Sequence, residues 1–228
     1  MKTIGVLGGM GPHASLEFYR MLIEMSISEG ANNNETFPHI LISNLPVPDF
    51  IEDRSREEEA VQMVEREAKV LEQAGADFLV IVCNTMHIHL SRFKSAVDIP
   101  ILSMITLIAD RVCSDGIKTV GLLGSPTTIQ SRLYQDLLLE KGVTSVIPTA
   151  SDQDRVTGSI FAAVAGNVRE EHRSSLLEVV GRFSDAGAEA VLLGCTELPS
   201  VLQGVPETLP VYKSISILAE ETCNKSYS

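Results

Sequence analysis

The feature that most constrains how this 228-residue chain can fold is an internal repeat. The segment KTIGVLGG (2–9) returns as KTVGLLGS (118–125), an offset of 116 residues (118 minus 2). Further along, AGADFLVIVCNT (74–85) returns as AGAEAVLLGCTE (186–197), an offset of 112 residues (186 minus 74). Two blocks in the same order at nearly the same offset indicate a duplication. The chain should therefore contain two similar lobes related by a pseudo-twofold axis.

Each copy alternates short apolar runs with amphipathic stretches, which is typical of βαβ units and parallel sheets. We therefore predict an α/β fold with mainly parallel sheets flanked by helices. The expected strands are 4–7, 40–43, 78–82, 100–102, 120–123, 143–147, 190–193 and 210–212. The expected helices include 14–27, 54–73, 131–141, 169–185 and 214–223.

The charge, the apolar runs and the cysteines indicate which partners, compartment and metal sites to expect. The formal net charge is −12, a surface that repels phosphate backbones, so we expect no nucleic-acid partner. The apolar runs are too short for a membrane span, and the N-terminus looks like a first strand rather than a signal peptide. The four cysteines form neither a CxxC pair nor a Cys/His cluster at zinc spacing. We therefore expect reduced thiols, a cytoplasmic protein and no metal site.

Cys83 and Cys195 end equivalent strands of the two copies. Ligands of parallel α/β sheets bind outside the carboxyl ends of the strands, so the duplication predicts two thiols that face one ligand from opposite sides. One acid/base group on each face of a carbon suits stereochemical inversion, in which a thiolate removes a proton and a thiol delivers one. We therefore predict that Cys83 and Cys195 are the catalytic acid/base pair.

The turns after these strands supply the expected ligand-binding groups. Glycines in LGGMGP (7–12) let backbone amides approach a ligand closely, and LGSPTT (123–128) supplies hydroxyl donors. Amides and hydroxyls that follow each cysteine can stabilise a thiolate or hold a carboxylate. The candidate binding residues on these grounds are Gly11, Asn84, Thr85, Ser125, Thr127, Thr196 and Glu197.

Two other patterns have competing interpretations. Gly9 to Ala14 fits the dinucleotide fingerprint G-x-G-x-x-[GA], but Pro12 lies inside the turn and the second strand ends on Asn44 rather than an acidic residue. These departures argue against NAD binding. His87 follows the Cys83 turn and either orients it or serves as a core or helix-start histidine.

Together, GVLGGMGP, VCNTMH and LLGCTELP resemble the cofactor-independent aspartate/glutamate racemase family, in its aspartate racemase branch. The resemblance covers essentially the whole chain, and it implies that Met10 is a further ligand-binding residue. It implies a homodimer, an amino-acid substrate, and proton transfer by two cysteines without pyridoxal phosphate or metal. It also implies that residues 1–104 and 209–228 form one lobe and residues 105–208 the other, with the active site in the cleft between them.

Two departures from the family pattern concern the substrate. Aspartate racemases that resemble this chain carry Asp-Arg where it has Asp49-Phe50, and a lysine where it has Val164. These basic residues help to hold the substrate's carboxylates, and a buried carboxylate without donors is costly. Phe50 and Val164 therefore leave the aspartate preference open. Arg54 or Arg56 is a possible substitute, although both also fit a solvated helix start.

Other functions remain possible on the same frame. A related cysteine-dependent isomerase or decarboxylase would use identical thiols, and a non-catalytic small-molecule-binding homologue would need neither. Product analysis separates the enzyme classes, and thiol titration separates a catalyst from a binding module.

Overall fold

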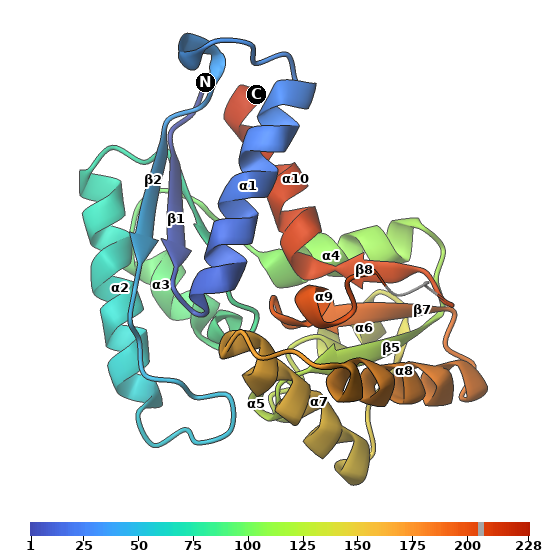
Figure 1. Cartoon of the computed structure of the whole chain (residues 1–228). Coiled ribbons are helices and arrows are strands. Elements are labelled where there is room, and N and C mark those ends of the chain that lie inside the picture. Colours follow the sequence, from blue (N-terminus) through green and yellow to red (C-terminus); the bar gives the residue numbers. More distant parts are fainter. Residues whose placement is uncertain (205–207) are drawn as a thin grey trace. The chain divides into compact units, whose positions relative to one another are not determined.

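The computed structural model describes residues 1–204 and 208–228, which form two compact units. Met1–Leu107 and Ile215–Ser228 make the first unit, and Ile108–Ser214 makes the second. In the described residues each unit contains a four-stranded parallel sheet with flanking helices (Figure 1). The predicted α/β fold with two similar lobes is confirmed.

The first unit contains the N-terminal half of the chain and the last helix. Its elements are β1 (Ile4–Gly8), α1 (Pro12–Ser28), the 3-10 helix η1 (Asn34–Thr36), β2 (Ile40–Asn44), α2 (Glu57–Gln73), β3 (Phe78–Ile81), the 3-10 helix η2 (Thr85–His89), α3 (Leu90–Ala96), β4 (Ile101–Leu102) and α10 (Ser214–Tyr227). Helix α4 (Met104–Ser114) begins in this unit and ends in the second.

The second unit repeats the strand pattern with different helices. Its elements are β5 (Thr119–Gly124), α5 (Pro126–Gln130), α6 (Gln135–Glu140), β6 (Thr144–Val146), α7 (Ala150–Val164), α8 (Glu170–Asp185), β7 (Ala190–Gly194), α9 (Leu198–Val201) and β8 (Val211–Lys213). In chain order, α7 lies between β6 and α8, where the first copy has only the loop between β2 and α2.

The two sheets have the same topology, which is the structural counterpart of the sequence repeat. The strand orders are β2-β1-β3-β4 and β6-β5-β7-β8, so the first strand of each copy lies between the second and the third. In such a sheet the chain reverses direction across the sheet between these two inner strands. This switch point is where open α/β sheets bind their ligands.

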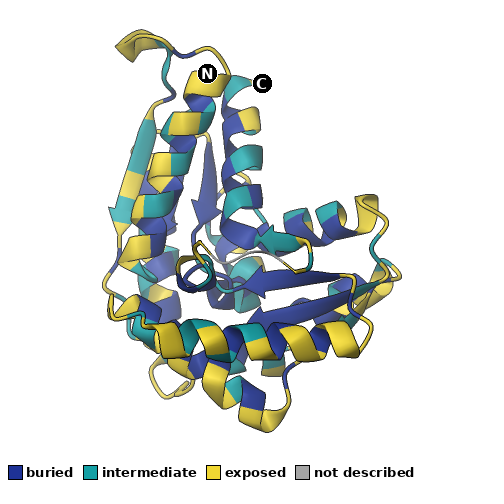
Figure 2. Cartoon of the chain, turned by 45° about the vertical axis from the view of Figure 1, so that its right-hand side comes forward, coloured by how far each residue is buried: buried dark blue, intermediate teal, exposed yellow. Residues whose placement is uncertain are grey.

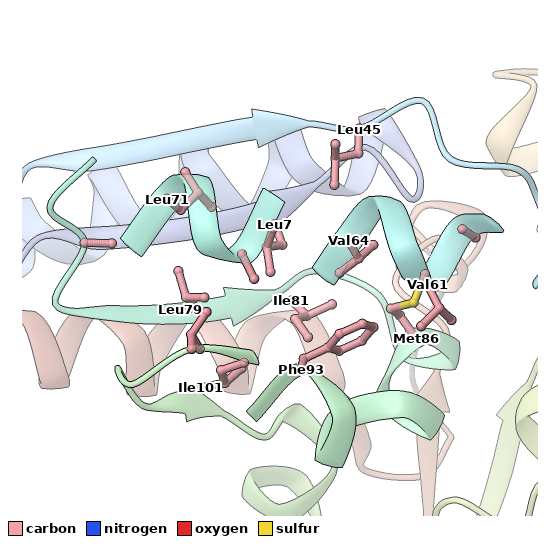
Figure 3. Close-up of a cluster of buried hydrophobic side chains, with 14 of the residues drawn as sticks. Leu7, Leu45, Val61, Val64, Leu71, Leu79, Ile81, Met86, Phe93 and Ile101 are labelled. Atoms are coloured by element: carbon pink, nitrogen blue, oxygen red, sulfur yellow. The ribbon is translucent and has the colours of Figure 1, made fainter. Parts of the chain in front are cut away.

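Apolar side chains cover both faces of the first sheet. On one face, side chains of α1 and α10 pack on β1 and β3, and the two helices run alongside each other (Figure 1). On the other face, α2 and α3 contribute Val61, Val64 and Phe93 to a second cluster with Leu7 and Ile81 (Figure 3). The inner strands β1 and β3 are buried throughout, as strands covered on both faces should be (Figure 2).

The division into units differs from the expected boundaries in two places. β8 was expected in the returning segment 209–228, but it pairs with β7 in the second sheet. Residues 105–107 were expected in the second lobe, but they belong to the first unit. Both differences arise because the chain crosses between units near the starts of α4 and α10, rather than in the loops before them. Residues 205–207, part of the expected second lobe, lie outside the described residues.

Candidate functional site

The first group of candidate residues lies at the carboxyl ends of β1 and β3. Leu7 pairs with Ile81, and the Val82 amide donates to the Leu7 carbonyl at 3.0 Å. Two residues after Ile81, Cys83 is partly exposed. The turn that carries Cys83, Asn84 and Thr85 therefore lies beside the turn that begins at Gly9, at the switch point of the first sheet.

The second group occupies the equivalent place in the other sheet. Gly124 pairs with Gly194, so Ser125 and Cys195 follow two residues that lie opposite each other. Cys195, like Cys83, is partly exposed, whereas Thr196 and Glu197 are buried. Each unit thus places one cysteine at the same point of the same topology, as the repeat predicts.

The remaining two cysteines differ from this pair. None of the four, all of which lie in the described residues, forms a disulfide. Cys113 is exposed on α4, and its thiol lies 3.7 Å from the Lys141 carbonyl oxygen. Cys223 is buried on α10, and burial raises the pKa of its thiol. A buried high-pKa thiol is inert, so we place Cys223 among the core side chains.

The turn after β1 is held by a hydroxyl that sequence reasoning missed. The Gly9 amide donates to Ser15 Oγ at 2.8 Å, and that hydroxyl donates to the Gly11 carbonyl at 3.1 Å. Gly11 is the N-cap of α1, and Met10 packs against the cluster of buried side chains that Cys83 also borders. The repeat carried a signal for this residue, because Ser15 matches Ser131 at the 116-residue offset (131 minus 15).

The turn after β5 is organised by side-chain hydrogen bonds. Ser125 is the N-cap of α5: its hydroxyl accepts from the Thr128 amide at 3.1 Å and donates to Thr128 Oγ1 at 2.9 Å. Gln153 of α7 donates to the Gly124 carbonyl at 3.0 Å. Ser125 therefore shapes the turn, while Thr127 remains a candidate for ligand contact. Gln153 had no sequence signal, because α7 has no counterpart in the first copy.

His87 is fully inside the first unit and bonded on both sides. Its Nδ1 lies 2.8 Å from the Cys83 carbonyl oxygen, and the Met104 amide donates to its Nε2 at 3.1 Å. Because the carbonyl accepts and the amide donates, Nδ1 carries the proton and Nε2 the lone pair. Burial lowers the pKa of His87 from 6.5 to about 4, so the ring is neutral at pH 7. His87 is therefore a core histidine that also contacts the Cys83 turn.

In the described residues, no group of three or more His, Cys, Asp or Glu side chains is arranged to hold a metal ion. Among the same residues, no helix is both long and apolar enough to span a membrane.

Comparison with known proteins identifies the family. The family model described as Asp/Glu/Hydantoin racemase matches residues 7–222. The chain belongs to this racemase family. It is 27% identical over 220 residues to the broad specificity amino-acid racemase RacX of Bacillus subtilis (strain 168), covering 96% of both chains.

Solved structures of the racemase family show the same fold. An aspartate racemase from Picrophilus torridus superposes with a TM-score of 0.86 at 30% identity, covering 100% of this chain and 95% of that one. An aspartate racemase homologue from Pyrococcus horikoshii OT3 gives a TM-score of 0.82 at 27% identity, and the match covers 100% of each chain. The resemblance recognised from the sequence is confirmed at the level of the family.

Phe50 and Val164, the two positions where basic residues were expected, have distinct environments in this racemase family member. Phe50 is only 5% exposed and belongs to the same buried cluster that Met10 and Cys83 pack against. Val164 is the last residue of α7, with 38% of its surface exposed. Phe50 thus adds apolar surface to the cluster that borders Cys83. The role assigned to Val164 stays a prediction.

The two arginines that could replace the missing basic residues are already paired. Arg54 binds both carboxylate oxygens of Glu57, at 2.6 and 2.8 Å, and Arg56 binds both of Glu59, at 2.9 and 2.8 Å. Each guanidinium already forms a bidentate ion pair with a glutamate of α2, so it does not need a substrate carboxylate as a partner. The arrangement favours the helix-start interpretation over a substrate-binding one.

We therefore expect Arg54→Ala and Arg56→Ala to leave KM and kcat unchanged for any amino acid that the enzyme racemises. Exposed pairs of this kind contribute at most about 1 kcal/mol to stability, so unfolding should shift little as well. Steady-state kinetics and thermal unfolding of both variants test this. A large rise in KM confined to acidic substrates would show that an arginine releases its glutamate to bind the side chain.

The buried His87 predicts a specific dependence of stability on pH. The unfolded chain binds a proton near pH 6.5, while the folded chain binds it only near pH 4, so lowering the pH through this window favours unfolding. The free energy of unfolding should fall by up to about 3 kcal/mol between these values. Urea unfolding at several pH values measures the slope.

His87→Gln should remove this slope, whereas the exposed His39→Gln should keep it. The buried carboxylate of Asp152, whose pKa is held low chiefly by the Arg182 hydrogen bond, contributes only at the acidic end. A wild-type stability that does not change between pH 6.5 and 4.5 would contradict the prediction.

Proposed function

We propose that this protein is an amino-acid racemase that interconverts L and D enantiomers by two-base proton transfer between Cys83 and Cys195. The observation that carries the proposal is the equivalence of the two thiols. Each follows the third strand of its sheet, beside the turn that follows the first strand, at a switch point where ligands bind. Membership of the racemase family supports the same reaction class.

The chemistry needs no group beyond the chain's own residues and the substrate. One cysteine, as thiolate, takes the α-proton and leaves a carbanion whose charge spreads into the substrate carboxyl group. The other, as thiol, gives its proton to the opposite face of the same carbon, and the bond order of the carboxyl group is restored. The two thiols exchange protonation states, and proton exchange with solvent resets them for the next turnover. We propose neither pyridoxal phosphate nor a metal in this cycle.

Substrate binding falls to the polar groups of the four turns. The backbone of Met10 and Gly11 lies at the start of α1, where amides favour a carboxylate. Asn84 and Thr85 beside one cysteine, and Thr127 and Thr196 near the other, supply amide and hydroxyl donors. We assign Glu197, only 4% exposed directly after Cys195-Thr196, to the substrate ammonium. These assignments rest on position in the repeat and on burial.

We further propose that the preferred side chains are not acidic. Phe50 adds apolar surface to the cluster that borders Cys83 and Met10, and Arg54 and Arg56 are each held by a glutamate. A carboxylate side chain on that side would lose water without gaining a cation. The broad specificity named for the Bacillus subtilis relative is compatible with this choice.

A racemisation screen in D2O tests the proposal. Purified protein is incubated with single L-amino acids of acidic, polar and apolar character, and optical purity and loss of the α-proton signal are followed together. We expect deuterium incorporation accompanied by inversion, with apolar or uncharged polar substrates ahead of aspartate. Absence of both changes across the panel would refute the racemase assignment. A decarboxylated or rearranged product would assign the same thiols to a different reaction.

A further inference from the structure

The Cys83 turn is fixed to another element by a side chain that donates and accepts at once. His87 lies four residues after Cys83 and reaches back to its carbonyl oxygen at 2.8 Å. On its other side the ring accepts from the Met104 amide at 3.1 Å. Two segments that are 17 residues apart (104 minus 87) are thereby joined through one imidazole.

The partner on the far side of the ring is the start of a helix. Met104 is the first residue of α4, so its amide has no acceptor within the helix. Met104 is completely buried, and water cannot satisfy that amide. His87 Nε2 therefore acts as a cap, while Nδ1 holds the backbone of the residue that carries the candidate thiol. Removing the ring takes the acceptor away from the buried Met104 amide, at a cost of about 1–3 kcal/mol, and also removes a donor from the Cys83 carbonyl.

The geometry also selects one tautomer. If Nε2 carried the proton instead, its N–H would face the Met104 N–H, and the Nδ1 lone pair would face the Cys83 carbonyl lone pairs at 2.8 Å. The Leu102 carbonyl, which also lies near the ring, would gain a donor but would not offset these two repulsions. The neutral ring with its proton on Nδ1 satisfies the hydrogen bonds to both the Cys83 carbonyl and the Met104 amide. Such a ring cannot serve as the base that deprotonates Cys83, because its Nε2 lone pair is already occupied.

The equivalent position in the second copy differs. Four residues after Cys195 the chain has Pro199, which carries no side-chain donor or acceptor, so this position cannot do for Cys195 what His87 does for Cys83. A residue that acts only on Cys83 gives a way to perturb one thiol and leave the other as an internal reference.

We propose that His87 is a positioning residue that fixes the Cys83 turn against the start of α4, in the neutral form protonated on Nδ1, a role that Pro199 at the equivalent place after Cys195 does not have. The proposal rests on the proposed function for the role of Cys83, but the hydrogen-bond geometry is independent of it. Met104 is also the first residue of a helix that begins in the first unit and continues past Leu107 into the second.

The first test needs no substrate, and it uses a variant only to assign the signal. Two-bond nitrogen–proton NMR spectra of the wild-type protein at pH 7 distinguish the two neutral tautomers from imidazolium. We expect one histidine ring, assigned to His87 by its loss in His87→Gln, to be protonated on Nδ1 alone. Protonation on Nε2, or on both nitrogens, would overturn the proposal whatever reaction the protein catalyses.

The second test compares three variants that remove different parts of the device. His87→Asn keeps a donor near the Cys83 carbonyl, His87→Gln keeps an acceptor near the Met104 amide, and His87→Phe keeps only the apolar ring. Site-resolved alkylation with iodoacetamide, followed by peptide mass spectrometry, reports each thiol separately. We expect the alkylation rate of Cys83 to change severalfold in His87→Phe and by less in His87→Asn. The alkylation rate of Cys195 should not change in either variant. His89→Asn in the same 3-10 helix is the matched control.

Racemase kinetics add a readout that separates this proposal from the function on which it rests. Misplacing a catalytic group by about 1 Å costs up to about 10²-fold in rate, so His87→Phe should lower kcat/KM by about 10- to 100-fold with partial rescue in His87→Asn. Equal alkylation changes at both cysteines, or an unchanged Cys83 in every variant, would overturn positioning. A wild-type protein without racemase activity but with the expected alkylation pattern would refute the function and keep the positioning role.

Discussion

Serine in place of either Cys83 or Cys195 is expected to abolish racemisation in both directions. Inversion needs a proton removed on one face and delivered on the other, and a hydroxyl is far too weak an acid and base to replace a thiol. General acid–base groups contribute about 10²–10⁴-fold each, so the remaining rate should lie at or below that fraction of the wild-type rate. Loss of optical rotation with time, measured from each pure enantiomer, checks the prediction.

Deuterium exchange makes the same variants more informative. A protein with one thiol can still remove the α-proton from one enantiomer and return solvent deuterium to the same face. We therefore expect Cys83→Ser and Cys195→Ser each to exchange a single enantiomer without inversion, and to select opposite enantiomers. This complementary pattern would assign each thiol to its face of the substrate.

Cys113→Ser is the matched control, because this thiol is exposed on α4 and its contact is a backbone carbonyl 3.7 Å away. It should racemise like the wild-type protein. Should either Cys83→Ser or Cys195→Ser retain the wild-type rate while folding normally, the two-base mechanism would be wrong.

The second large effect is expected from Gly9→Ala, at the turn between β1 and α1. Gly9 has φ of +91°, and a Cβ at this position would lie 2.4 Å from both the amide nitrogen and the carbonyl oxygen of Leu45. The conformation alone costs an alanine about 1–2 kcal/mol. Forcing the Leu45 backbone away adds about 1–3 kcal/mol and strains the hydrogen bond that the Leu45 amide donates to the Gly8 carbonyl.

Gly75→Ala measures the conformational cost alone, so its difference from Gly9→Ala gives the cost of the clash with Leu45. Gly75 has nearly the same φ, +95°, but an added Cβ would meet nothing within 4 Å. We expect Gly75→Ala to lose about 1–2 kcal/mol of unfolding free energy with normal kinetics. Gly9→Ala should lose clearly more and also lose activity, because the Met10-Gly11 backbone moves. Urea unfolding and racemase assays measure both quantities. Equal destabilisation in the two variants would show that the β1 turn yields without cost.

The inner strands were predictable because they are buried on both faces. Runs such as IGVLG and AVLLG are apolar throughout and are bounded by polar residues or turns, so their limits could be read to within a residue or two. The repeat then supplied the topology, since equal blocks in equal order predict equal sheets. The positions of both candidate thiols followed from the same repeat, whereas the family was recognised from the motifs GVLGGMGP, VCNTMH and LLGCTELP.

Helices of the second unit were harder to predict. The stretch 131–141 was expected to be one helix, but α6 begins only at Gln135. The Ser131 hydroxyl donates to the Thr128 carbonyl at 2.8 Å, and Arg132 adopts φ of +58°, so a turn replaces the first part of the helix. Local hydrogen bonds from serine compete with helix formation. Helix α7, with Gly158 and several short polar residues, was missed for a similar reason.

The contacts made by His87 could not be read from sequence at all. Its acceptor and donor partners come from different elements, and only the folded chain brings the Met104 amide to the ring. A histidine four residues after a cysteine is compatible with many structures. The same limit applied to Arg54 and Arg56. The glutamates that they bind are visible in the sequence, but only the side-chain geometry shows that the ion pairs form.

The return of α10 to the first unit has a consequence for synthesis on the ribosome. Residues 108–214 are contiguous, so the second unit can fold as soon as they emerge. The first unit must wait, because Ile215, Leu218 and Cys223 complete the apolar cluster that covers β1 and β3, and the Lys2 amide donates to the Ser226 carbonyl at 2.8 Å. The half that is translated first is therefore expected to mature last, with its α10-facing surface open to chaperones until residues 215–228 arrive.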